Sequence, residues 1–370
     1  MQYYLQHFFV PDWKYRELRP AGSGNNSDLH NLGYVQNVIV GQVLARIIPL
    51  ADAGPDPDPK YVMDTPVLPC GPNTVVSPQR ANYLLAAANG YVFYNEGRIT
   101  VKKLLNVRSD VGFKTGNIFF VGDLAVHGSV KPGFEAVARD VHVMDMIEGG
   151  IVRAHGNLLV DGGCKGGAGE HCRIRVDGTM QAGFAEKVNI VAAGNVLIEK
   201  YSFFSDIYAG ANLIVKGLIN GGCIQAYGSV FAAGQVGNRA EKPTQIFVGY
   251  NPADIRVLER EESRIAEMSE TIRHLQRIVG HLPEETNAAT QRLADLVRHR
   301  EDLIRRRDER WKRLSLDESH AEKCRLVVQG TVLPGVEIAI GRAFLRIESP
   351  LTNVSFALVD NEIKISALAV

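Results

Sequence analysis

The sequence predicts a mainly β protein. We expect a parallel β-helix, a solenoid of about 17-residue coils, with an inserted antiparallel α-helical coiled-coil hairpin and a small N-terminal β-rich domain. Three observations predict this fold: a glycine-punctuated repeat, a charged segment with heptad spacing, and alternating strand patterns that precede the repeat. The expected domains are the N-terminal β-rich domain (1–115), the parallel β-helix (116–250), the helical hairpin (251–320), and strands that continue or cap the β-helix (321–370).

The repeat sets the register of the β-helix. Seven lines of sequence superimpose, and five of the six intervals between them are 16 or 17 residues. The lines start at Gly122, Arg139, Gly156, Gly178, Gly194, Ala211 and Gly228. The third and fifth places of the lines, such as Val141 and Val143, are mostly apolar, which is the two-residue period of a strand with one buried face. A further apolar pair precedes each line start by four and two places, and only Glu135 breaks that column.

The second place of each line predicts a turn. It holds only small polar residues, namely Asp123, Asp140, Asn157, Thr179, Asn195, Asn212 and Ser229. Side chains of these types hydrogen-bond nearby backbone at bends, so we expect each of them to bond its own local backbone.

One interval is 22 residues long and contains the stretch "CKGGAGEHC". A phosphate-binding loop would need the pattern G-x-x-x-x-G-K-[ST] between a strand and a helix, which is missing. A structural metal site needs four ligands, whereas Cys164, His171 and Cys172 supply at most three. We therefore predict a protruding glycine-rich loop, with no metal and no cofactor.

The helical hairpin is predicted by a change in composition. From Arg256 to Arg313 glycine almost disappears and charged residues crowd together. Apolar residues step by three and four, the spacing of a coiled-coil seam, and they are Ile265, Met268, Ile272, Leu275, Val279 and Leu282. The stretch "GHLPEE" carries a glycine and a proline that end one helix and open the next.

The second helix of the hairpin is strongly basic. Its seam offers Leu293, Leu296, Leu303, Trp311 and Leu314, with Arg300 and Arg307 on the same face. The run "RHREDLIRRRDERWKR" has a local excess of positive charge, which is typical of a solvated helix face and also suits a partner surface. The candidate partner-binding residues are Arg300, Arg305, Arg306, Arg307, Arg310 and Trp311.

Composition and charge limit the function classes. The chain of 370 residues is 45% hydrophobic, and its 41 basic and 41 acidic residues cancel, so we expect no nucleic-acid partner. Five scattered cysteines argue against a disulfide framework. The N-terminal stretch lacks the pattern of a signal peptide, and no run of about 18 apolar residues occurs. We therefore expect a cytoplasmic protein without a membrane span.

No catalytic signature is present. The patterns of serine hydrolases, zinc hydrolases and dinucleotide-binding enzymes are missing from the sequence. Asp161 and Glu199 would stand about 9.6 Å apart across two coils, at the outer limit for an inverting glycosidase pair, with Gly183 between them. No carboxylate cluster supports either residue, so we expect a protein that is not an enzyme.

Three stretches carry a resemblance to a known family. "KTGNIFFVGDLAVHGSV", "GGCIQAYGSVFAAGQVGN", and "VGYNP" followed by a charged helical segment resemble the flagellar assembly protein A family. The resemblance covers most of the chain and implies a cytoplasmic bacterial protein linked to flagellar assembly or placement, with no established chemistry. The family's glycine-rich turn with lysine and aspartate after a "VLA" strand is replaced here by "AGPDPDPKYVMD".

Two function hypotheses follow from the sequence. The first is a non-catalytic cytoplasmic scaffold or regulator of flagellar assembly or placement, which contacts protein partners of the flagellar apparatus. The second is a carbohydrate-binding or carbohydrate-modifying β-helix protein that binds a glycan on its exposed strand face. A β-helix with open ends could also associate with itself.

Overall fold

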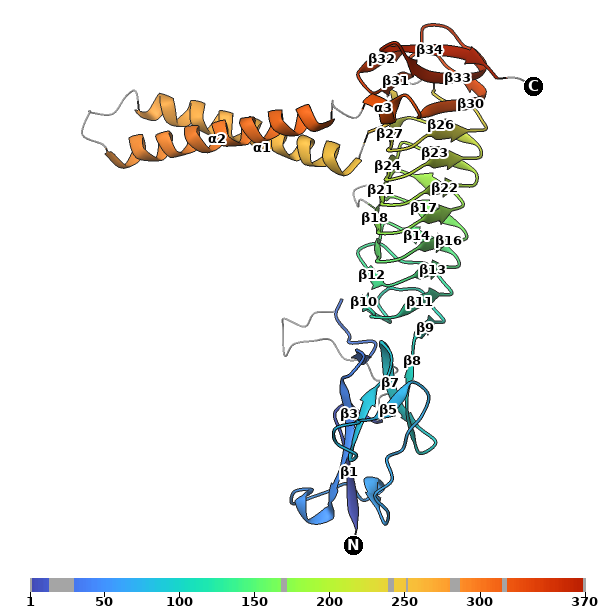
Figure 1. Cartoon of the computed structure of the whole chain (residues 1–370), viewed down its shortest axis with the longest axis vertical. Helices are drawn as coiled ribbons and strands as arrows, with labels where there is room; N and C mark the ends of the chain where they lie inside the picture. The colour runs from blue at the N-terminus through green and yellow to red at the C-terminus, as the bar shows by residue number, and fades with distance from the viewer. Residues whose placement is uncertain are drawn as a thin grey trace. The chain divides into compact units, whose positions relative to one another are not determined.

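The computed structural model describes residues 2–12, 30–167, 172–238, 243–250, 252–279, 287–314 and 318–368. It divides into two compact units, residues 1–200 and 201–370, and short strands dominate both (Figure 1). About seven coils of about 17 residues form the predicted parallel β-solenoid, and the mainly β fold class is confirmed.

The N-terminal part of the first unit contains two antiparallel sheets. The five-stranded sheet has, in spatial order, β4 (Val62–Met63), β1 (Tyr3–His7), β3 (Val43–Pro49), β6 (Tyr83–Ala86) and β5 (Thr74–Val76). The three-stranded sheet has β2 (Asn37–Val38), β7 (Gly90–Asn95) and β8 (Arg98–Lys102). Two short 3-10 helices, Leu50–Asp52 and Pro59–Tyr61, lie in the connections. The two sheets share one core, in which Leu44, Leu84 and Ile99 are fully buried.

The coils of the first unit form three stacks of parallel strands. One stack is β10 (Ile118–Phe119), β12 (Glu135–Ala138), β15 (Ile151–Ala154), β18 (Cys172–Val176) and β21 (Val188–Ala192). The second is β9 (Leu104–Val107), β11 (Asp123–Val126), β13 (Val141–Val143), β16 (Leu158–Val160), β19 (Met180–Ala182) and β22 (Val196–Ile198). The third is β14 (Met146–Glu148), β17 (Gly163–Lys165) and β20 (Ala185–Glu186).

The second unit continues the same pattern and then ends it. Its parallel strands are β23 (Tyr201–Phe203), β24 (Asp206–Ala209), β25 (Leu213–Val215), β26 (Leu218–Asn220), β27 (Gly222–Ala226), β28 (Val230–Ala232), β29 (Thr244–Val248), β30 (Arg325–Val332) and β31 (Glu337–Ile340). Three strands then pair antiparallel, namely β32 (Ala343–Arg346), β33 (Leu351–Val359) and β34 (Glu362–Ala367). Pairing therefore changes from parallel to antiparallel at β30 and β31, the last parallel strands in the described part of the chain.

The predicted register of the coils is correct. All residues at the third and fifth places of the seven lines are buried, including Val141 and Val143, whereas the next residue, Met144, has an exposed fraction of 37%. One detail is wrong: Glu135 does not interrupt the preceding apolar column. Strand β12 is offset by one residue, so that Ala136 pairs with Ile118 and is buried, while Glu135 points outward and pairs with Arg153 (3.2 Å).

At Asp140, Asn157 and Asn212 the polar second place bonds the backbone of the next coil and not its own turn. The Oδ1 atom of Asp140 accepts from the backbone N–H of Asn157 (2.7 Å), and Asn157 Oδ1 accepts from the N–H of Thr179 (2.9 Å). Asn212 repeats the bond toward Ser229 (2.9 Å). The prediction of a local bond is wrong at these places. The corner of the next coil is stacked directly alongside, and its backbone N–H needs an acceptor.

This ladder of side chains explains the glycine at the line starts. A Cβ atom on Gly156 would lie 2.1 Å from Asp140 Oδ1, and a Cβ on Gly228 would lie 2.4 Å from Asn212 Oδ1. The carboxylate or amide of one coil thus occupies the space where the next coil would place a side chain.

The helical segment is inserted into a single coil. Helices α1 (Pro252–Val279) and α2 (Asn287–Leu314) lie side by side, and the short helix α3 (Glu318–Ala321) follows them (Figure 1). The segment interrupts the corner between β29 and β30, yet β30 pairs with β28 in the register of an ordinary coil, with Val230 opposite Leu326. We call residues 252–314 the arm.

The predicted seam of the arm is its least exposed face. Ile272 and Leu303 are buried, and Ile265, Met268 and Leu275 are half-buried. The side chains of Val279, Leu282, Trp311 and Leu314 lie outside the described residues. Of the helices that the structure describes, none is long and apolar enough to span a membrane.

We expect the register to decide how the fold tolerates charge. Val143→Asp should lower the free energy of unfolding by more than about 3 kcal/mol, because it buries an unpaired carboxylate. Met144→Asp, at the exposed residue that directly follows this strand, should cost less than about 1 kcal/mol. Thermal unfolding followed by circular dichroism measures both, and equal losses would contradict the register.

The glycine and the acidic residue of the ladder should be energetically coupled. Gly156→Ala should destabilise by about 1–3 kcal/mol, because the new methyl group displaces the Asp140 carboxylate from its bond to the next coil. In an Asp140→Ala background the same change should cost less, with a coupling free energy of about 1 kcal/mol or more. Gly167→Ala is the control, since a Cβ there meets nothing within 4 Å. Additive losses in the double-mutant cycle would refute the explanation.

Candidate interaction surfaces

Of the six residues predicted to bind a partner, the four whose side chains the structure describes lie on two faces of α2. Arg300 and Arg307 are half-buried on the seam face of α2, whereas Arg305 and Arg306 are exposed. The side chains of Arg310 and Trp311 lie outside the described residues. The arginines on α2 therefore divide between a packed face and a solvent face.

Carboxylates on the same helix neutralise part of the basic run. Arg305 pairs with Asp302 one turn earlier, and Arg307 Nη2 lies 2.7 Å from Asp308 Oδ1. Arg306 has no ion pair within the part of the chain that the structure describes. Exposed pairs of this kind contribute little to stability. Among the described side chains of the basic run 298–313, Arg306 is an exposed cation without an ion pair.

The base of the arm is fixed to a coil by residues that sequence reasoning missed. The ring of His320 on α3 stacks on Tyr227 with 3.9 Å between centroids, and His320 Nε2 donates to the Tyr227 carbonyl oxygen (2.8 Å). Ala321 is buried and would touch a Cβ placed on Gly249, where the chain leaves β29. No local pattern signals these contacts, because Tyr227 and His320 are 93 residues apart in the sequence.

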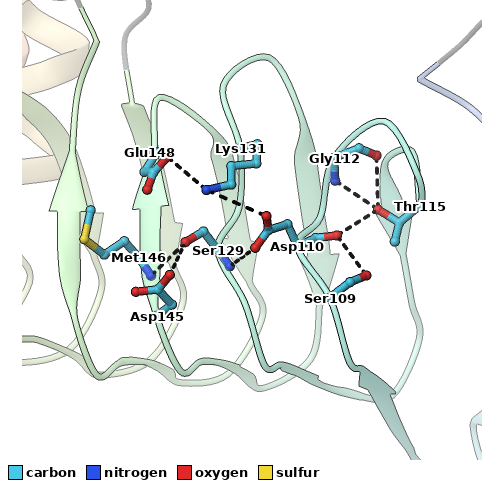
Figure 2. A network of polar contacts seen from close by, with 9 residues as sticks. All are labelled: Ser109, Asp110, Gly112, Thr115, Ser129, Lys131, Asp145, Met146 and Glu148. Carbon is cyan, nitrogen blue, oxygen red and sulfur yellow. Dashed lines mark hydrogen bonds and ion pairs between the residues drawn. The ribbon is translucent and has the colours of Figure 1, made fainter.

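A polar network joins the first coils at one corner. Figure 2 shows Lys131 between two carboxylates of neighbouring coils, with its Nζ atom 3.1 Å from Glu148 and 3.7 Å from Asp110. The backbone N–H of Ser129 donates to Asp110 Oδ1 (2.8 Å), and the Ser129 hydroxyl donates to Asp145 (2.7 Å). The network repeats, at a second corner, the use of carboxylates to join successive coils.

The network includes a serine, a carboxylate and a lysine, but its geometry does not suit nucleophilic catalysis. Ser129 is fully buried, so no substrate reaches its hydroxyl group. The hydrogen bond to Glu148 raises the pKa of Lys131, which keeps its ammonium group charged and removes it as a general base. The contacts stabilise the stacking of coils.

A shallow groove of about 620 Å³ crosses the outward face of the second stack. Apolar side chains along it include Leu104, Met144 and Leu159, which are exposed. Polar groups along it include His142, whose Nε2 atom lies 2.9 Å from Asp161 Oδ2. The residues that line the groove contain no tyrosine, phenylalanine or tryptophan.

The proposed carboxylate pair has two separate sets of contacts. Asp161 bonds His142, whereas Glu199 accepts a hydrogen bond from Gln181 (3.2 Å). Gly183 cannot accept even a methyl group, because its Cβ would lie 1.7 Å from the Gly162 carbonyl oxygen. Asp161 and Glu199 therefore each contact a side chain of the preceding coil and not one another.

The two cysteines of the long coil are core residues. Cys164 on β17 and Cys172 on β18 are fully buried, and His171 lies outside the described residues. Burial raises the pKa of the Cys164 thiol well above its usual value and that of Cys172 to about 12. Among the described residues, no group of three or more histidine, cysteine, aspartate or glutamate side chains is placed to hold a metal ion.

Comparison with known proteins gives one match. The family model of the flagellar assembly protein A β-solenoid domain matches residues 103–363, which is more than half of the chain. No curated protein and no solved structure matches the chain significantly.

We predict that the glycine-rich loop is structural. A thiol reagent at pH 8 should modify exposed Cys70 and leave Cys164 and Cys172 unmodified in the folded protein, because burial keeps both thiols neutral. Mass spectrometry of the modified peptides and elemental analysis of protein purified without chelator measure this. Stoichiometric zinc, together with cysteines that become reactive after chelation, would show a metal site instead.

Proposed function

Because the chain belongs to the flagellar assembly protein A family, we propose that it is a non-catalytic cytoplasmic scaffold or regulator of flagellar assembly or placement that makes protein–protein contacts. The family supports the link to flagellar assembly. The inserted arm is the observation that best supports a role in protein–protein contacts.

The arm supports a contact role because the fold does not need it for its core. Its apolar seam is covered within the arm, where α1 packs on α2. The strands on either side of the insertion keep the register of an ordinary coil, with Val230 opposite Leu326. Helices that are added at a corner, without contributing to the core of the coils, add surface and not stability.

The solvent face of α2 is the part of the arm that we propose to bind. Arg306 is exposed and uncompensated within the described residues, and Arg305 beside it shares its charge with Asp302. Arginine is enriched at protein interfaces because its planar group makes several hydrogen bonds at once. Arg300 and Arg307 support this face indirectly, since both lie on the seam that holds α2 against α1.

The alternative is a carbohydrate-binding or carbohydrate-modifying β-helix. The groove on the second stack favours it, because a long polymer could lie across several coils there. The groove has no aromatic ring among its lining residues on which the apolar face of a sugar could pack. We therefore favour protein partners, and binding of cell-wall glycan fragments would reverse that choice.

Removal of the arm should separate folding from function. Replacing residues 256–314 with a short Gly/Ser linker should leave a cooperative thermal transition, because neighbouring coils supply the stabilising contacts and loop closure depends weakly on length. The same deletion should abolish motility and the recovery of partners by affinity isolation. The anchoring residues His320 and Ala321 stay in this variant.

Point variants sharpen the experiment. Arg306→Glu should weaken partner recovery, whereas Arg264→Glu, an exposed change on α1, should not. A soluble arm-deleted protein that fully restores motility would place the working surface elsewhere, and an aggregated product would show that the arm supports the coils.

A further inference from the structure

A second cavity, of about 660 Å³, lies in the first unit where the N-terminal sheets meet the first coil. Its walls come from the β7–β8 hairpin, from β9 and from the residues that follow β9. The volume falls within the range of cavities that hold small organic ligands. Its lining residues are Tyr34, Val35, Gln36, Tyr91, Val92, Phe93, Lys102, Leu105, Asn106, Arg108 and Ser109.

The alternation of the β7–β8 hairpin places two aromatic rings and a lysine on the cavity side. Val92 and Val101 face the core and are buried, so Tyr91, Phe93 and Lys102 project from the opposite face. Lys102 stands directly opposite Tyr91 in the hairpin, and its Nζ atom lies 5.0 Å from the centre of the Phe93 ring. The rings of Tyr91 and Phe93 are 5.7 Å apart and inclined by 32°.

The charge of the cavity is positive. Its lining residues include Lys102 and Arg108 and no carboxylate. Neither cation forms an ion pair within the described residues, whereas Lys131, Arg139 and Arg153 on the coils all pair with carboxylates. Two uncompensated cations beside aromatic rings are suited to an anion that carries a planar ring.

The segment that carries Arg108 is held in place by the network in Figure 2. Asp110, two residues further on, accepts from the backbone of Ser129 in the next coil (2.8 Å). Thr115 closes the same loop by accepting from the N–H of Gly112 (3.0 Å). Polar contacts between coils therefore also position the rim of the cavity.

We propose that this cavity binds a nucleotide. The base would pack against Tyr91 and Phe93, since aromatic side chains stack with any base. Lys102 and Arg108 would bind the phosphate, and the amide of Asn106 offers hydrogen bonds to polar edges. The amide of Gln36 is already bonded to the Val10 backbone. The site lies outside the arm and is independent of the proposed contact function.

Isothermal titration calorimetry of the full chain tests the proposal, with GMP, AMP, guanosine and inorganic phosphate as separate ligands. We expect saturable binding of at least one mononucleotide at one site per chain, with guanosine and phosphate each binding at least about tenfold more weakly, because each lacks one half of the recognition. Phosphate that binds as tightly as the nucleotides would reduce the site to an anion site and overturn the proposal.

Matched variants locate the binding site. Lys102→Met and Arg108→Met should each raise the Kd of the nucleotide about tenfold or more, the loss expected for one charge-assisted hydrogen bond. Lys103→Met is the control, because Lys103 is also exposed and does not line the cavity. No binding of either mononucleotide at about 1 mM, or equal losses in the control, would refute the site.

Discussion

The stacking of one coil on the next is the interaction on which the rest of the structure depends. Parallel strands supply most of these hydrogen bonds, but strands end at each corner, where backbone N–H groups lose their partners. Asp140, Asn157 and Asn212 solve this by accepting a hydrogen bond from the adjacent coil. These hydrogen bonds impose a second requirement. The side chain of Asp140 or Asn212 fills the space beside the next coil, so that coil must start with a glycine, Gly156 or Gly228.

The same constraint decides where insertions are tolerated. The arm and the extra residues of the long coil are both inserted between strands, and the register of the flanking strands is kept. The arm returns through His320 and Cys324, which pack on the coil that it left. Binding surfaces can therefore be added at corners without disturbing the core, which is how a repeat fold acquires specific contacts.

The periodic features of this fold could be predicted from the sequence, and the features that join distant segments could not. Repeat length, buried places and the arm's seam follow from local spacing, because they depend on neighbours in the chain. The offset of β12 at Ala136 was not predicted, because one extra residue in a corner shifts a strand without changing its composition. The cavity beside Tyr91 and Lys102 escaped for a related reason, since its walls come from segments separated by dozens of residues. The ladder of polar side chains was predicted in part. Its residue types were correct, but its hydrogen-bond donors lie in the next coil and not in the local turn.

Native-state hydrogen exchange measured on peptides from the whole chain tests the central claim, that inter-coil bonds at the corners complete a solenoid that is stable without the arm. The claim predicts that the amides of Asn157, Thr179 and Ser229 are protected like those of the adjoining strands, and that the arm exchanges through a separate opening of lower free energy. Fast exchange at these three corner amides, or a single opening shared by the arm and the coils, would contradict it.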